Sequence, residues 1–187
     1  MLSLPLACAT VSAPGERIRM QVTLQLALRP VWEEIDALGV RCLDFFQREG
    51  VDPDAGNALA MVVCELAENA TKYGHFDGEN EIVKVSLAVE RSFVTVTVSN
   101  PVAESETDSL EILDNTIQWI RGFHDPFQAY LERLRDVSTQ SLFSSESKLG
   151  LVRIAYEGQS TLDFYLGADR RLVVSATYPF QSVGGQA

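Results

Sequence analysis

Two neighbouring segments alternate between apolar and polar residues, and this alternation constrains the fold more than any other feature of the chain. The segments run from Glu81 to Glu90 and from Phe93 to Ser99. Alternate residues of a strand point to the same side, so each segment has one apolar face. The apolar positions are Val83, Val85, Leu87, Val89, Val94, Val96 and Val98. Only two residues, Arg91 and Ser92, separate the segments, so the sequence predicts an antiparallel hairpin.

The rest of the chain predicts three more strands and five helices. A second hairpin is expected where Thr161 to Leu166 and Leu172 to Tyr178 flank a short turn, and Arg17 to Leu28 alternates as a half-buried strand does. Apolar residues at helical spacing predict helices over residues 30–50, 52–74, 109–121, 126–137 and 149–156. Hairpins dominate the pairing. We therefore expect an α+β two-layer sandwich, with a mixed, mainly antiparallel sheet that is covered on one face by helices.

Length and charge limit the domain organisation and the partners. The 187 residues suffice for one domain with its own core. We expect this domain to span residues 17–180, after an extension over residues 1–16 and before a loose tail over residues 181–187. A net charge of -11 repels nucleic acids and anionic membranes, so neither is an expected partner.

The N-terminal residues and the number and spacing of the cysteines predict a cytoplasmic location. The first apolar run has no basic residue before it and is broken by Pro5, unlike a signal peptide. No later stretch approaches the ~20 apolar residues of a membrane-spanning helix. The three cysteines, Cys8, Cys42 and Cys64, form neither an even disulfide framework nor a zinc spacing.

The helix expected over residues 52–74 carries a group of polar residues near its end. Glu65, Asn69 and Tyr73 are four residues apart, and Lys72 lies three beyond Asn69, so a helix brings them to one face. Asp52 is the expected cap and Gly74 the expected stop. The alternative interpretation is an amphipathic helix whose polar face is merely solvated.

The pattern Glu65-x-x-x-Asn69-Ala70-x-Lys72-Tyr73 resembles the N box of the gyrase and histidine-kinase ATPase superfamily. The predicted order of strands and helices is also similar to the order in that superfamily. The resemblance implies a histidine-kinase-like ATPase fold that binds ATP and Mg²⁺. It implies that Asn69 ligates Mg²⁺, that Glu65 is a catalytic general base, and that Lys72 and Tyr73 belong to the nucleotide site.

Two glycine-containing motifs of that superfamily are only partly present. Asn100 stands where the family has an aspartate that accepts from adenine, and the residues after it are not glycines. Asn100 still offers an acceptor oxygen. The second glycine box keeps only Leu149, Gly150 and Leu151, and Lys148 just before them offers a charge to phosphate. The alternative for this segment is an ordinary helix start. Between the two boxes, residues 104–147 occupy the place of the family's helical lid.

The resemblance is greatest to anti-sigma-factor serine kinases, which leaves several functions open. The first is a regulatory serine kinase that phosphorylates a small partner protein, either anti-anti-sigma-like or sigma-factor-like. The second is a non-catalytic domain that sequesters such a partner, and the third is an α/β interaction domain unrelated to nucleotides. Such relatives commonly dimerise, so a homodimer is a further expectation. The aromatic residues Trp119, Phe123, Phe127 and Tyr130 are either the core of the lid or a docking surface.

Overall fold

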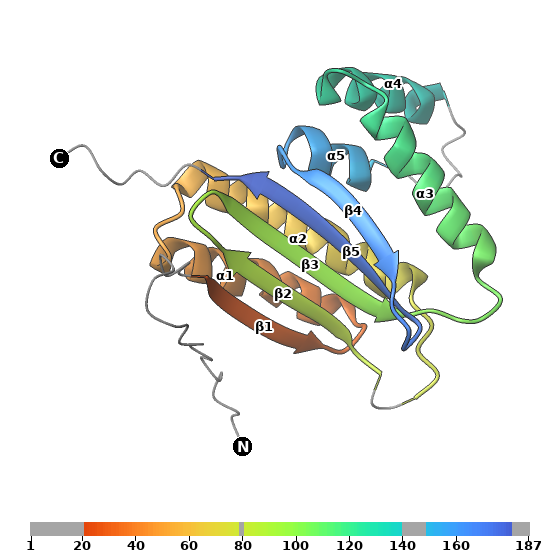
Figure 1. Ribbon diagram of the computed structural model, residues 1–187, viewed down its shortest axis with the longest axis horizontal. Coiled ribbons are helices and arrows are strands. Elements are labelled where there is room, and N and C mark those ends of the chain that lie inside the picture. Colours follow the sequence, from red (N-terminus) through yellow and green to blue (C-terminus); the bar gives the residue numbers. More distant parts are fainter. Residues whose placement is uncertain (1–20, 79–80, 140–148, 181–187) are drawn as a thin grey trace, which may run out of the picture.

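The computed structural model describes residues 21–78, 81–139 and 149–180, which form one sheet and five helices. The strands are β1 (Val22–Leu28), β2 (Val83–Val89), β3 (Phe93–Pro101), β4 (Thr161–Leu166) and β5 (Arg171–Pro179). The helices are α1 (Trp32–Arg48), α2 (Pro53–Tyr73), α3 (Thr107–Arg121), α4 (Pro126–Thr139) and α5 (Gly150–Tyr156). Figure 1 shows the helices gathered on one side of the sheet.

The sheet has the strand order β1-β2-β3-β5-β4 and contains both predicted hairpins. All four pairings are antiparallel, so the sheet is wholly antiparallel and the expected α+β two-layer class is confirmed. Val96, at the centre of the sheet, faces Leu87 on one side and Ala176 on the other. The strands pair so that the apolar positions predicted for β2 and β3 are all buried beneath the helices, as the alternation predicted.

The ends of the elements lie close to the predicted ones. β1 begins at Val22, and the predicted residues 17–20 of that strand lie outside the described part of the chain. β3 and β5 extend slightly beyond the predicted ends, because they pair with each other as far as Pro101 and Arg171. The two strands lie far apart in the sequence, so the local pattern of neither strand predicts how far this pairing extends.

Helix α2 crosses the sheet and carries the largest share of the helical core. Asp52 caps it as predicted, since its Oδ1 accepts hydrogen bonds from the backbone N–H groups of Asp54 (2.9 Å) and Ala55 (3.3 Å). The predicted apolar stripe is buried, namely Leu59, Val62, Val63, Leu66 and Ala70. α2 ends at Gly74, but with an ordinary φ of -77°. The glycine is needed because a side-chain carbon there would lie 2.5 Å from the carbonyl oxygen of Ala70 and from the ring of Phe76.

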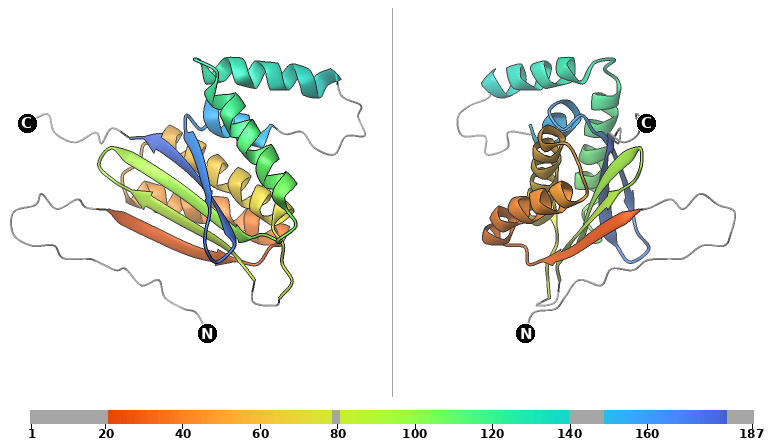
Figure 2. Two further views of the ribbon diagram at one scale, coloured as in Figure 1. Left: turned by 45° about the vertical axis from the view of Figure 1, so that its right-hand side comes forward. Right: turned by 90° about the vertical axis from the view of Figure 1, so that its left-hand side faces the viewer.

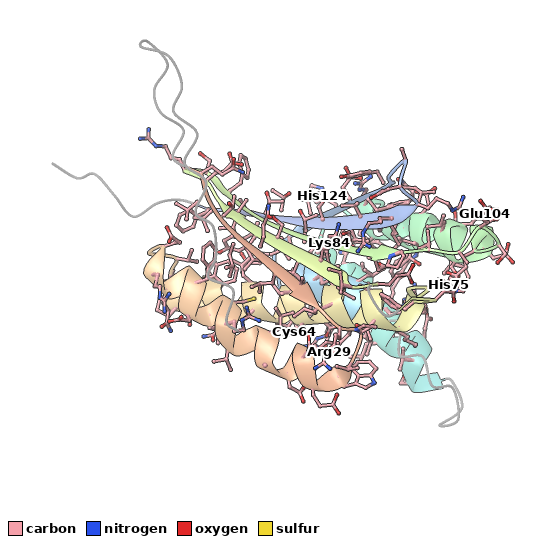
Figure 3. All side chains as sticks on the ribbon, turned by 90° about the horizontal axis from the view of Figure 1, so that it is seen from below. Arg29, Cys64, His75, Lys84, Glu104 and His124 are labelled. Carbon is pink, nitrogen blue, oxygen red and sulfur yellow. The ribbon has the colours of Figure 1, made fainter. Side chains whose placement is uncertain are left out.

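The two faces of the sheet differ in what covers them. α1 and α2 lie side by side on one face, with α5 beyond α2 toward β4 (Figure 2). Cys64 lies where α1 and α2 meet (Figure 3), and Gly39 of α1 allows this approach, because a side-chain carbon there would be 3.3 Å from the Cys64 sulfur. The described residues place no helix on the opposite face.

Helices α3 and α4 lie within the segment expected to form a lid. α3 leans over the end of the sheet, and α4 packs on α5 (Figure 1). The ring of Trp119 packs against Phe123 with centroids 4.8 Å apart, and the rings of Phe127 and Tyr130 both contact Tyr156 of α5. Each of these four aromatic residues therefore packs against another aromatic ring, and Phe127 is also 39% exposed to solvent. No helix in the described part of the chain is long and apolar enough to cross a membrane.

Candidate functional site

A cavity of about 280 Å³ lies between α2, α3, the start of α5 and the adjoining ends of β3 and β5. Most of its wall is aliphatic, formed by Leu66, Ala70, Val98, Val102, Leu110, Ile112, Leu113, Leu151, Leu172 and Val174. Its polar lining comes from Asn69, Tyr73, Asn100, Glu106, Ser109 and Thr116. An apolar chamber with few polar groups is typical of small-molecule sites.

The cavity brings together five of the residues singled out in the sequence. Asn69 and Tyr73 reach it from α2, Asn100 from β3, and Gly150 and Leu151 from α5. Their separation in sequence is large, so only the fold makes them neighbours. Leu149 packs against the core beside the cavity, and Lys148 lies outside the described residues.

Asn100 is the most deeply buried polar residue of the cavity, with 2% of its surface exposed. Its Nδ2 donates a 3.1 Å hydrogen bond to the carbonyl oxygen of Pro101. That bond uses one of the two amide hydrogens, so the carboxamide keeps further capacity to donate and accept. Burial of a polar group is costly without partners, which makes Asn100 the strongest pointer to a polar ligand.

Glu65 and Lys72 do not line the cavity, although they lie on the same helix as Asn69. The Oε1 atom of Glu65 instead accepts a short hydrogen bond from Nη1 of Arg153 in α5. The Nε and Nη2 atoms of Arg153 each donate to Oε2 of Glu157 at 3.2 Å. Lys72 is exposed, and its Nζ lies 5.0 Å from the ring centroid of Tyr73. The four polar groups of α2 therefore do not converge on one point.

Burial raises the pKa of the Glu65 carboxyl above its ordinary value. The positive charge of Arg153 lowers the pKa, and the carboxylates of Glu68 and Glu157 raise it again. Only 17% of the Glu65 side chain is exposed, so solvent compensates little for the lost hydration. The direction of the shift makes the Glu65 carboxylate a stronger base than an ordinary glutamate.

Gly150 is where Glu65 and the cavity meet. A side-chain carbon at Gly150 would lie 2.5 Å from Oε2 of Glu65 and 3.7 Å from Nδ2 of Asn69. Gly150 itself lines the cavity. The missing side chain thus leaves the space that the carboxylate occupies, and it keeps Oε2 close to the cavity wall.

Sequence reasoning missed Arg153 and Glu106. Arg153 forms an i,i+4 pair with Glu157, which the sequence displays, but its contact with Glu65 spans 88 residues. Glu106 lies just before α3 and is the charged residue among those that line the cavity. A charged residue at the start of a lid helix is a weak signal, because such residues are common at exposed helix starts.

Two features of the cavity bear on whether it could hold a nucleotide and a magnesium ion. Its aliphatic walls offer contact to a flat ring, and Asn69 offers a hard oxygen of the kind that Mg²⁺ prefers. The described residues include no group of three His, Cys, Asp or Glu side chains able to hold a metal. A single carboxamide is enough for a magnesium ion whose other ligands are phosphate oxygens and water.

The fold is similar to that of a chain in the crystal structure of the SiaB–SiaC complex from Pseudomonas aeruginosa. The TM-score is 0.63 at 23% sequence identity, over 82% of this chain and 88% of that chain. At this identity the likeness concerns the fold alone. The sequence matches no protein-family model and no curated protein.

The contact between Gly150 and Glu65 predicts a strong coupling between these positions. Gly150→Ala forces the carboxylate to move and should lower the free energy of unfolding by about 1 kcal/mol. In a Glu65→Ala background the same change should cost little, which gives a coupling energy of at least about 0.5 kcal/mol. Urea unfolding of the four proteins measures this. Gly56→Ala is the control, because its new carbon would lie at an ordinary 3.8 Å from Phe46. Additive effects of the two changes would show that the contact is absent.

The raised pKa of Glu65 predicts a specific pH dependence of stability. A carboxyl with a folded pKa above the unfolded value favours folding when protonated. Its contribution is complete below about pH 4.3, the unfolded glutamate value, and is lost as the pH rises through the folded pKa. Glu65→Gln removes this contribution. Wild type should therefore lose stability relative to Glu65→Gln as the pH rises above about 4, measured by urea unfolding. A stability difference that stays constant with pH would contradict the raised pKa.

Proposed function

We propose that this protein is a regulatory serine kinase that binds Mg-ATP in the cavity beneath α3 and phosphorylates a small partner protein. The observation that carries the proposal is that Asn69 and Asn100, from different elements, line one apolar cavity. The resemblance implies that Asn69 ligates the magnesium ion and that Asn100 hydrogen-bonds the adenine base. Their meeting in one cavity supports both assignments together.

Each residue of the site has a distinct part in this proposal. Asn100 hydrogen-bonds the edge of the purine, and the aliphatic walls hold the ring. Asn69 holds the magnesium ion, which when bound would neutralise charge on the triphosphate. Leu149, Gly150 and Leu151 lie beside the phosphates, and Tyr73 completes the nucleotide site from α2. Glu65 takes the proton from the attacking serine hydroxyl.

A protein partner is supported by the similar structure, which is that of a complex named for two components, SiaB and SiaC. The two chains share a fold over most of their lengths, so a surface for a second protein suits the same scaffold. The partner is proposed to be a small regulatory protein of the anti-anti-sigma-like or sigma-factor-like kind. A net charge of -11 favours partners with basic surfaces over nucleic acids or membranes, and a cytoplasmic location goes with such a role.

The ion pair of Glu65 with Arg153 favours a second candidate function. A carboxylate held by a guanidinium is stabilised in its charged form and is a weaker base. If Glu65 never leaves this pair, the domain transfers no phosphate and acts by sequestering its partner. The two candidates differ in phosphoryl transfer, which is measurable.

Nucleotide binding predicts a thermal shift that depends on magnesium. At a hundredfold excess of ATP over its Kd, binding should stabilise the folded protein by about 2.7 kcal/mol. Asn69→Ala should remove the part that depends on magnesium, and Asn100→Ala should remove most of the shift. Asn115→Ala is the matched control, since this exposed asparagine of α3 does not line the cavity. A wild-type melting curve that ATP and magnesium leave unmoved would argue against the nucleotide site.

Catalysis predicts transfer of label from ATP to the partner. With γ-labelled ATP, Glu65→Gln should lower the rate by about 10²–10⁴-fold, the usual effect of losing a general base. Glu33→Gln, an exposed glutamate of α1 that does not line the cavity, should transfer at the wild-type rate. Undiminished transfer by Glu65→Gln would end its assigned role. Binding of ATP without any transfer by wild type would favour the sequestering domain.

A further inference from the structure

Glu106 is the charged residue among those that line the cavity, and neither the fold nor the proposed catalysis uses its side chain. It is the N-cap residue of α3, but its side chain makes no capping hydrogen bond. Within residues 21–78, 81–139 and 149–180 its carboxylate has no hydrogen-bond or ion-pair partner, whereas its exposed neighbour Glu104 lies 4.0 Å from Arg170. Glu106 is half-buried, and a carboxylate that is partly removed from water is costly without a partner. It is therefore available to a ligand that donates hydrogen bonds.

The loop between β3 and α3 holds Glu106 beside the cavity (Figure 1). The N–H of Val102 donates to the carbonyl oxygen of Arg170 at 3.1 Å, and Nη2 of Arg170 donates to the carbonyl oxygen of Ala103 at 2.9 Å. The N–H of Glu106 donates to the same Ala103 carbonyl oxygen at 3.3 Å. The chain therefore turns back directly after β3, and this turn brings Glu106 to the wall of the cavity that the end of β3 forms with Asn100.

The buried carboxamide of Asn100 has a fixed orientation on that wall. Its Nδ2 donates to the carbonyl oxygen of Pro101, which can only accept, so the bond determines which end of the carboxamide is the nitrogen. Within the described residues this is the one hydrogen bond of the Asn100 side chain. One amide hydrogen and Oδ1 remain. Asn100 thus offers one donor and one acceptor to a molecule in the cavity.

The Watson–Crick edges of the two purines differ in how they match these groups. Guanine presents an acceptor, O6, followed by two donors, N1–H and the 2-amino group. Adenine presents a donor, the 6-amino group, followed by an acceptor, N1, and an apolar C2–H. A carboxamide pairs with either edge, because it both donates and accepts. A carboxylate only accepts, so beside Asn100 the carboxylate of Glu106 pairs with the donors of guanine but faces the lone pair of adenine N1.

We infer that the base site of this cavity selects guanine, so that GTP binds more tightly than ATP. The remaining amide hydrogen of Asn100 donates to O6, and the carboxylate of Glu106 accepts from N1–H and the 2-amino group. This inference rests on the proposed nucleotide site and specifies the base that the site recognises, with ATP as a weaker ligand of the same cavity. Glu106 is then the residue that determines specificity, and Asn100 is the residue that holds either purine.

Three nucleotides test the inference on the wild-type protein through the base alone. Isothermal titration calorimetry with the magnesium complexes of GTP, inosine triphosphate and ATP gives the three Kd values. Inosine triphosphate lacks only the 2-amino group of GTP, so it should bind about tenfold more weakly than GTP. ATP should bind at least as weakly as inosine triphosphate, because its N1 faces the carboxylate.

Glu106→Gln tests the residue that distinguishes the bases. The change replaces one carboxylate oxygen by an amide donor, which then faces a donor of guanine. It should weaken the binding of GTP about 10–100-fold and leave the binding of ATP no weaker. Glu111→Gln is the matched control, because this exposed glutamate of the same helix does not line the cavity, and it should keep the wild-type order of affinities.

The outcomes separate this inference from the proposed function. Binding of ATP without GTP, or GTP that binds no more tightly than inosine triphosphate, would overturn the selection of guanine and leave the nucleotide site intact. Unchanged affinity for GTP in a folded Glu106→Gln variant would remove Glu106 from the base site. Binding of none of the three nucleotides would overturn the nucleotide site itself, and this inference with it. The comparison on wild type needs no variant, so it decides even where Glu106→Gln does not fold.

Discussion

The packing of α2 against the sheet is the interaction on which the rest of the structure depends. Its apolar stripe, with Val62, Val63 and Leu66 at the centre, is buried almost completely, and each such side chain stabilises the fold by about 1.5–3 kcal/mol. This burial fixes the rotation of α2 about its own axis. The same rotation carries Asn69 to the cavity and Glu65 to α5. Both side chains lie near Gly150 of α5, so the burial of the stripe also fixes how the two polar groups face that glycine.

Local patterns were enough to predict the elements and the fold class, because each pattern is complete within its segment. The alternation of β2 and β3 and the cap at Asp52 need no distant partner. The site was predictable only in part. Asn69 and Asn100 share the cavity, in agreement with the resemblance. The ion pair between Glu65 and Arg153 depends on how α5 crosses α2, and the sequence of neither helix specifies that crossing. The spacing of Lys72 placed it on the same helix face as Asn69, but its side chain is exposed and does not line the cavity.

Gly150 and Asn100 differ as evidence for a ligand. Gly150 is explained within the protein itself, because the carboxylate of Glu65 fills the space of its missing side chain. It is therefore no independent sign of phosphate binding. Asn100 is explained only in part within the protein, because its Nδ2 donates to the carbonyl oxygen of Pro101, whereas an aliphatic residue there would continue the wall of the cavity without the cost of burying a carboxamide. Val102, which follows it, contributes a side chain to the cavity where the resembling family has glycine. The cavity beside Asn100 is thus narrower and more apolar than a glycine-rich turn would make it.

The geometry of Glu65 allows the ion pair and a catalytic role together. Arg153 binds Oε1, whereas Oε2 lies against Gly150, which lines the cavity. A guanidinium on one oxygen fixes the plane of the carboxylate and so aims the other oxygen at the gap that the glycine leaves. Burial, which raises the pKa, outweighs the lowering by Arg153. The hydrogen bond from Arg153 therefore lowers the pKa of Glu65 by less than burial raises it. If Glu65 serves as a base, Arg153 acts as a positioning residue. In a domain that only sequesters a partner, neither the glycine gap nor the orientation of Oε2 toward it would be required.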